Sequence, residues 1–272
     1  MWEIVTHGYM KKIIKRILIL LSILLLLVLC YVAWIIYGTK ISNPNNYKAI
    51  GDIPAPIGYV RINGSDQAFT KFLRSLPLKS RGEEVQRYTG GPSKHQSLYY
   101  AAIDLPLLSN AEQCADACMR LRAEYLFKTG RYSNIHFNDV NGRKLRYSGG
   151  ASRKAFEKYL KNVYQVASTF SLSREMKKRP LHDIQPGDIF VYAAVDRPGH
   201  KIGHAVMVAD VAVNKQGKIS LLLIEGNTPA QDFHVMRNLL NPFHSPWFSL
   251  DEDSDVLILG VFRFKPNELR HF

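Results

Sequence analysis

Several residue patterns that identify common enzyme classes are missing from this 272-residue sequence. It has no glycine-rich phosphate loop, no Gly-x-Ser-x-Gly nucleophile turn and no His-Glu-x-x-His motif. These absences argue against a P-loop nucleotide-binding enzyme, an α/β-hydrolase and a zinc metalloprotease of the usual kind. Internal repeats are also missing, which argues against a solenoid or propeller.

Acidic residues are outnumbered: 23 Asp and Glu face 36 Lys and Arg, and the net charge is +13. Only four of the basic residues precede residue 38, so the rest of the chain carries most of the excess. A basic domain is attracted to anionic surfaces such as lipid headgroups, cell-wall polymers or nucleic acid.

Long apolar runs are rare, and the single one lies near the N-terminus. Residues 17–37 could cross a bilayer as a helix, and a basic cluster precedes them. The basic flank predicts a cytoplasmic tail over residues 1–16 and an extracytoplasmic remainder. A cleaved signal peptide is the alternative, but the length of the run and the lack of a small-residue cleavage site favour a single-pass anchor in the lipid bilayer. Nucleic acid is therefore not an expected partner.

Composition then divides the remaining chain into two parts. Residues 38–57 hold Pro and Asn among small polar residues, which predicts an extended linker. Residues 58–272 predict one folded domain. Hydrophobic periodicity in it predicts helices at 66–76, 111–127 and 152–170, and strands at 59–62, 189–194, 204–213, 219–224 and 256–264. Two main helices followed by strands indicate an α+β domain with an antiparallel sheet.

Cysteine is scarce, with Cys30 in the apolar run and Cys114 and Cys118 one helical turn apart. Two cysteines at that spacing are poorly placed for a disulfide, so an exported domain would keep unpaired thiols. A zinc site built from Cys114, Cys118 and His204 would lack a fourth ligand. We therefore expect no metal and no other cofactor.

Three short motifs occur in an order that thiol chemistry requires. They are Gln113-Cys114 at the start of a predicted helix, Gly203-His204 at the start of a strand, and Glu225-Gly226-Asn227 at the end of the next strand. The positive end of a helix dipole favours a thiolate, and an imidazole can take the proton that the thiol releases. If these motifs meet in space, the protein is a cysteine hydrolase.

The segment Pro186-Gly187-Asp188 before one strand and Gly203-His204 before the next is similar to the second half of papain-like cell-wall hydrolases of the NlpC and CHAP types. The resemblance implies a papain-like fold, with helices packed on a small antiparallel barrel or sheet. It also implies Cys114 as nucleophile, His204 as general base and acid, Glu225 or Asn227 as the group that orients the imidazole, and Gln113 as an oxyanion donor. The expected activity is cleavage of an amide or peptide bond in peptidoglycan or another anionic envelope polymer.

A second resemblance covers nearly all of the predicted domain. Residues 72–78, 113–125, 135–138, 229–232 and 245–247 are similar to a bacterial family, domain of unknown function 4846. This resemblance implies an exported bacterial protein and no particular activity.

Each motif also has a simpler structural interpretation. Cys114 could be an inert core thiol, and His204 could bind a neighbouring carbonyl. Glu225 and Asn227 could serve only the turn, and His234 is expected in a solvated loop. Two functions therefore compete with the hydrolase: a non-catalytic module that binds anionic envelope polymers, and a structural envelope protein whose protein partners the sequence does not identify.

Overall fold

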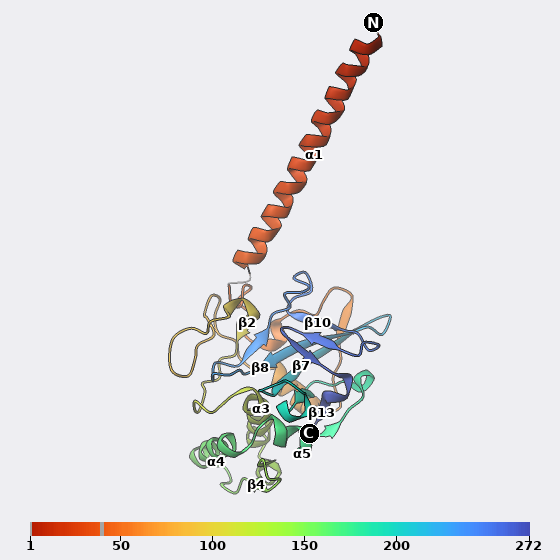
Figure 1. Cartoon of the computed structure of the whole chain (residues 1–272). Helices are drawn as coiled ribbons and strands as arrows, with labels where there is room; N and C mark the ends of the chain where they lie inside the picture. Colours follow the sequence, from red (N-terminus) through yellow and green to blue (C-terminus); the bar gives the residue numbers. More distant parts are fainter. Residues whose placement is uncertain (1, 39–40) are drawn as a thin grey trace. The chain divides into compact units, whose positions relative to one another are not determined.

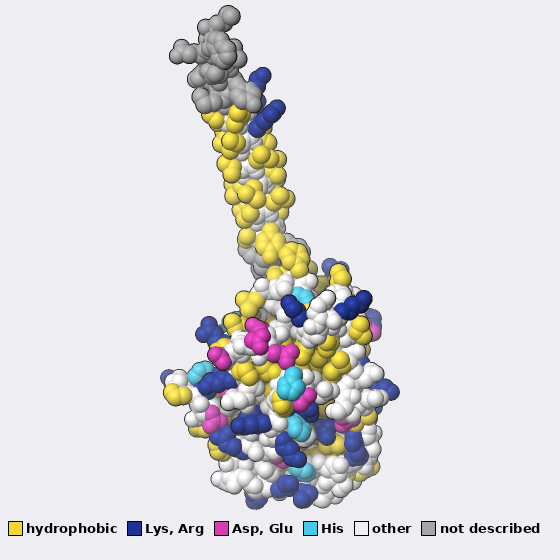
Figure 2. All heavy atoms as spheres, turned by 90° about the vertical axis from the view of Figure 1, so that its right-hand side faces the viewer, with side chains coloured by type: hydrophobic (Ala, Val, Ile, Leu, Met, Phe, Trp, Pro, Cys, Tyr) yellow, Lys and Arg dark blue, Asp and Glu magenta, His cyan; other side chains and the backbone are white. Residues whose placement is uncertain are grey.

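The structure, a computed structural model, describes residues 2–38 and 41–272, with side chains in the first helix over residues 12–33 only. The chain forms two compact units, Met1–Lys40 and Ile41–Phe272. The first consists of helix α1, Trp2–Gly38. Within it, Lys12–Ala33 is long and apolar enough to cross a membrane, although a signal sequence would also meet these criteria. Figure 2 shows this stretch as an apolar surface with Lys and Arg at one end.

The second unit contains a nine-stranded sheet whose strand pairs are all antiparallel. The strand order is β2-β9-β8-β7-β6-β13-β5, while β1 pairs with β7 and β10 pairs with β8. The strands are β1 Tyr59–Arg61, β2 Tyr99–Ala102, β5 Lys177–Lys178, β6 Ile189–Tyr192, β7 His204–Asn214, β8 Ile219–Glu225, β9 His234–Met236, β10 Trp247–Leu250 and β13 Leu269–His271. Two further hairpins pair β3 His136–Asn138 with β4 Lys144–Arg146, and β11 Leu257–Leu259 with β12 Phe262–Phe264.

Four helices accompany the sheet: α2 Gln67–Arg74, α3 Cys114–Lys128, α4 Arg153–Val166 and α5 Thr169–Glu175. In Figure 1, α3, α4 and α5 lie together beside the strands. The sequence predicts one helix over 152–170, but the chain turns extended at Ala167 and begins α5 after a new cap. The Phe170 backbone N–H donates to Ser168 Oγ at 3.1 Å. In a continuous helix this N–H would instead donate to a backbone carbonyl oxygen of the preceding turn.

Buried side chains on the two faces of the central hairpin belong to different clusters. In β7, Ala205, Met207 and Ala209 join the cluster that contains α3 and α4, while Val206 and Val208 join the cluster around β11 and β12. Alternate residues of a strand point to opposite faces, so a strand that is covered on both faces is apolar throughout. This explains the apolar run 205–209 in the first half of β7, which the buried Asp210 ends.

The domain begins earlier than the sequence predicts. Residues 41–57, expected as part of the linker, belong to the second compact unit, where Ile50 and Ile53 are buried. The Asn43 side chain donates to the Lys79 carbonyl oxygen at 2.8 Å, and its backbone N–H donates to the Tyr100 carbonyl oxygen at 2.6 Å. The Pro and Asn residues thus shape a packed irregular segment, a role that composition does not separate from a tether.

The predicted combination of helices and an antiparallel sheet is confirmed, as is an apolar helix near the N-terminus. The polar region 131–155 contains the β3–β4 hairpin. Strands β9 and β10 were not predicted, because each is short and lies between turn-rich segments. Both nevertheless pair with β8, and β9 places one further residue in the site.

Candidate functional site

The first element of the site is the N-terminus of α3. Cys114 is the first residue of this helix and Gln113 is its N-cap, with φ −110° and ψ −156°. Asp116 returns one turn to accept the Gln113 backbone N–H at 2.9 Å, which holds the start of the helix in place. Cys114 therefore lies where the unpaired backbone N–H groups and the positive end of the helix dipole are concentrated.

The second element is the hairpin of β7 and β8. His204 is the first residue of β7 and Glu225 the last of β8, so the antiparallel pairing brings the two ends together. His204 Nε2–H donates to Glu225 Oε2 at 2.7 Å, and both side chains are buried. Gly203 is required before the histidine because a Cβ there would lie 2.5 Å from the Tyr192 carbonyl oxygen.

The helix and the hairpin meet at Cys114 and His204, and the interaction of these two side chains raises the pKa of the imidazole. Since Nε2 of the imidazole is occupied by Glu225, Nδ1 is the nitrogen left for the thiol. Burial alone would lower the pKa of His204, but the interactions with Cys114 and Glu225 outweigh it and raise the pKa to about 9. The ring of Phe262 stacks on the imidazole, with centroids 3.6 Å apart and planes 18° apart.

Glu225 is shared between two imidazoles. Its Oε2 accepts from His204, and its Oε1 accepts from His234 Nε2 at 3.1 Å. Burial raises the pKa of this carboxyl, but the bonds and charges of the two histidines outweigh burial and lower the pKa to about 2. The carboxylate is therefore ionised at neutral pH and fixed at both oxygens, as a group that orients an imidazole needs to be.

His234 occupies a position that differs from the sequence prediction. A solvated loop was expected, but His234 lies in β9 and is completely buried. Its Nδ1 lies 3.0 Å from the Asp232 carbonyl oxygen, and the ring of Tyr99 packs against it with centroids 4.1 Å apart. The apolar neighbours Phe233, Val235 and Met236 were a signal that this histidine is buried, but three residues are too few for a periodicity that would identify the strand.

Gly226 determines how closely β8 approaches α3. A Cβ on this residue would lie 3.0 Å from both the Gln113 carbonyl oxygen and the Ala117 Cβ. Contacts of that length are tighter than side chains normally accept. The glycine between Glu225 and Asn227 thus allows the last residue of β8 to pack directly against the helix turn that carries the thiol.

Gln113 and Asn227 contact the same threonine at the edge of the site. Thr228 Oγ1 donates to Gln113 Oε1 at 2.8 Å, which orients the amide and leaves its NH₂ group to donate elsewhere. Asn227 Oδ1 accepts from the Thr228 backbone N–H at 2.9 Å. The structure therefore brings Cys114 next to the hydrogen-bonded pair of His204 and Glu225, with Gln113 adjacent, while Asn227 supports the turn that follows.

Cys118 lies one turn farther into α3 and differs sharply from Cys114. It is completely enclosed, and burial raises the pKa of its thiol well above the usual range. A buried thiol of this kind is a packing residue. Over residues 12–33 and 41–272, no group of three or more His, Cys, Asp and Glu side chains is arranged to hold a metal ion.

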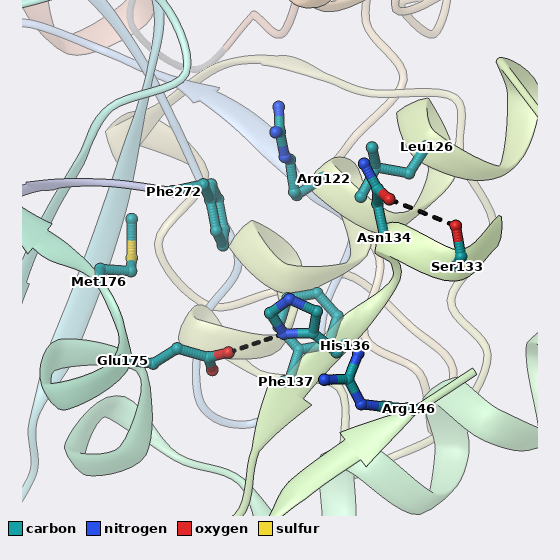
Figure 3. Close-up of a pocket in the computed structure, with 10 residues that line it drawn as sticks. All are labelled: Arg122, Leu126, Ser133, Asn134, His136, Phe137, Arg146, Glu175, Met176 and Phe272. Atoms are coloured by element: carbon teal, nitrogen blue, oxygen red, sulfur yellow. Dashed lines mark hydrogen bonds and ion pairs between the residues drawn. The ribbon is translucent and has the colours of Figure 1, made fainter. Parts of the chain in front are cut away.

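A cavity of about 380 Å³ lies apart from these residues, between α3, β3 and the C-terminus. Figure 3 shows His136 and Glu175 paired in it, with Nδ1 and Oε1 3.1 Å apart. The other oxygen of Glu175 accepts the Asn138 backbone N–H at 2.7 Å. Glu175 therefore fastens α5 to β3, and none of the predicted site residues lines this cavity.

Comparison with known families gives a match over residues 51–152 and 148–271 to the family described as domain of unknown function (4846). No curated protein and no solved structure matches the chain. The two matched segments together cover nearly the whole second unit, including α3, the β7–β8 hairpin and β9. The chain belongs to the domain of unknown function 4846 family, as the sequence predicts.

Proposed function

We propose that this protein is a membrane-anchored cysteine hydrolase that cleaves an amide or peptide bond outside the cytoplasm, in the bacterial cell wall. The observation that carries the proposal is the placement of Cys114, at the start of α3, beside the hydrogen-bonded pair of His204 and Glu225. A thiol at a helix N-terminus, an imidazole beside it and a carboxylate that fixes the imidazole are the parts that thiol catalysis needs. The same order of residues supports the resemblance to papain-like NlpC and CHAP hydrolases.

In this proposal, His204 is the imidazolium that holds the proton of Cys114, and the sulfur attacks the carbonyl carbon of the substrate. The tetrahedral oxyanion accepts hydrogen bonds from the Gln113 amide and from backbone N–H groups at the start of α3. His204 then gives its proton to the departing amine, which leaves a thioester on Cys114. Water, activated by His204, hydrolyses the thioester to a carboxylic acid and restores the thiol.

The envelope location is proposed from charge and hydropathy. Lys12, Lys15 and Arg16 flank the apolar part of α1 on its N-terminal side, and the positive-inside rule places that side in the cytoplasm. The second unit would then be extracytoplasmic, where peptidoglycan is an abundant polymer with amide bonds. The excess of basic residues on the chain favours such an anionic substrate.

Purified peptidoglycan tests the activity directly. We expect the full-length protein in detergent to release new amino groups from peptidoglycan, the Cys114→Ala protein to release none, and the Cys118→Ala protein to remain active. Cys118 is the matched control because it is on the same helix but is completely enclosed. Equal release by the wild-type and Cys114→Ala proteins would refute a role for this thiol.

Iodoacetamide gives a test that needs no knowledge of the substrate. Mass spectrometry should find Cys114 alkylated faster than a free thiol at neutral pH, with Cys118 unlabelled until the protein unfolds. The pH profile of labelling should change in a His204→Ala protein. A Cys114 that reacts no faster than a free cysteine would contradict an activated nucleophile.

A non-catalytic binding module is the second candidate, and the burial of the site favours it. Cys114 is only 6% exposed and His204 only 4%, and Phe262 covers one face of the imidazole. In that case peptidoglycan would bind without being cleaved. Equal retention of the wild-type and Cys114→Ala proteins on insoluble peptidoglycan, with no amine released by either, would support this candidate.

A further inference from the structure

A cavity of about 660 Å³ adjoins the Cys114 site. Asn227 and Thr228, which follow directly after Glu225 and Gly226, form part of its wall. Thr228 Oγ1 is hydrogen-bonded to the Gln113 side chain, so one residue contacts both the cavity and the proposed oxyanion donor. On another side, Tyr99 lines the cavity and packs against His234. The cavity wall thus contacts the site through Thr228 and Tyr99.

The charges around this cavity all have one sign. Arg87 and Lys94 are the charged residues that line it, and none of the lining residues is acidic. Lys94 and His95 are exposed at the rim, while Arg87 is half-buried. A concave surface with charges of one sign concentrates ions of the opposite sign.

Two buried donors in the cavity wall have no acceptor. Gln231 is 2% exposed, and although its Oε1 accepts from Ser93 Oγ at 2.7 Å, its Nε2 has no partner among the described residues. Arg87 Nε is likewise buried and unpartnered within the described part of the chain. Because buried N–H groups are nearly always hydrogen-bonded, these two donors indicate a ligand with acceptor oxygens.

We propose that this cavity binds a carboxylate of the substrate next to the bond that Cys114 cleaves. This inference rests on the proposed hydrolase function and specifies its substrate: an amide whose neighbouring residue carries a free carboxylate. The two carboxylate oxygens would accept from Arg87 and Gln231, and Lys94 would attract the anion to the opening.

A pair of affinity labels tests the inference on the full-length protein. N-iodoacetyl-glutamate carries carboxylates, and its diamide has nearly the same shape without charge. At low ionic strength we expect the anionic label to alkylate Cys114 about tenfold faster than the diamide, an advantage that added salt reduces. Arg87→Gln and Lys94→Gln proteins should lose most of this preference. Lys158→Gln should keep it, because Lys158 is an exposed lysine on α4, away from the cavity.

The outcomes separate the two proposals. Fast labelling of Cys114 by both reagents at equal rates would overturn the carboxylate site and leave the hydrolase proposal standing. Labelling by neither reagent above the rate of a free thiol would overturn the activated nucleophile. A Cys114→Ala protein then gives a readout that needs no thiol: glutarate should raise its thermal unfolding temperature, whereas glutaramide should not. Equal shifts with inorganic phosphate, or a shift that survives Arg87→Gln and Lys94→Gln together, would overturn a carboxylate site.

Discussion

Replacing Glu225 with glutamine removes one negative charge from the environment of His204 while nearly preserving side-chain size. The glutamine oxygen can still accept the His204 Nε2–H at the position where the carboxylate now accepts at 2.7 Å. The substitution therefore removes the charge beside His204 and keeps its hydrogen bond, and it places the amide NH₂ where Oε1 now accepts from His234 Nε2. We expect the pKa of His204, about 9 in the wild-type protein, to fall.

The size of the fall follows from the geometry. An opposite charge at hydrogen-bonding distance in a buried site shifts a pKa by about 1–3 units, and one unit corresponds to about 1.4 kcal/mol. The folded pKa of His204 exceeds its ordinary value of 6.5, so its contribution to stability is complete below pH 6.5 and is lost as the pH rises through 9. In the Glu225→Gln protein the pKa of His204 is closer to its ordinary value. Its contribution to the free energy of unfolding is therefore smaller, and it disappears at a lower pH.

NMR titration of isotopically labelled histidine rings measures this directly, with His204 assigned by its loss in a His204→Ala protein. Glu84→Gln is the control, because it removes an equal charge from an exposed position. The midpoint for His204 should move down by about 1–3 units in Glu225→Gln and stay in place in Glu84→Gln. An unchanged midpoint in Glu225→Gln would show that Glu225 does not set the charge state of the imidazole.

Three further predictions concern the residues around this chain of hydrogen bonds. Gly226→Ala should slow iodoacetamide labelling of Cys114 and lower the free energy of unfolding by about 1–3 kcal/mol, because the alanine Cβ would press on the first turn of α3. An unchanged labelling rate and an unchanged urea midpoint would contradict this prediction. Burial raises the pKa of Asp116 from 3.8 to about 7, so its ionisation costs stability as the pH rises between these values. Urea unfolding should therefore show that Asp116→Asn raises the free energy of unfolding, relative to the wild type, by up to about 4 kcal/mol more at pH 8 than at pH 4. The same difference between variant and wild type at both pH values would count against this prediction. The lowered pKa of Glu225 contributes stability that is present above pH 4.5 and is lost as the pH falls through 2. In acid unfolding, the Glu225→Gln protein should lack the loss of stability that Glu225 causes between these pH values.

Periodicity was enough to predict three of the elements that carry the site, α3, β7 and β8, but not β9. The apolar runs of β7 and β8 and the helix that begins near Cys114 lie close to their expected bounds, because each is long and its burial pattern repeats. The break between α4 and α5 was missed, since a single serine cap ends one helix and starts the next without interrupting the hydrophobic pattern.

The site itself was predictable in part. Cys114, His204 and Glu225 stand at element ends, where turn residues mark a boundary, and they do come together. His234 was placed in solvent because β9 has three residues and no periodicity can be read over that length. The second imidazole on Glu225 depends on the pairing of β8 with β9, which only the folded chain reveals.

Base and carboxylate stand on one hairpin, while the sulfur comes from a helix that reaches them only by packing. The hydrogen bonds of the hairpin can persist after the helix has separated from it, so the sulfur–imidazole contact is sensitive to the loss of tertiary packing. In rising denaturant, Cys114 should therefore take on the reactivity of an ordinary thiol before the hairpin amides begin to exchange their hydrogens.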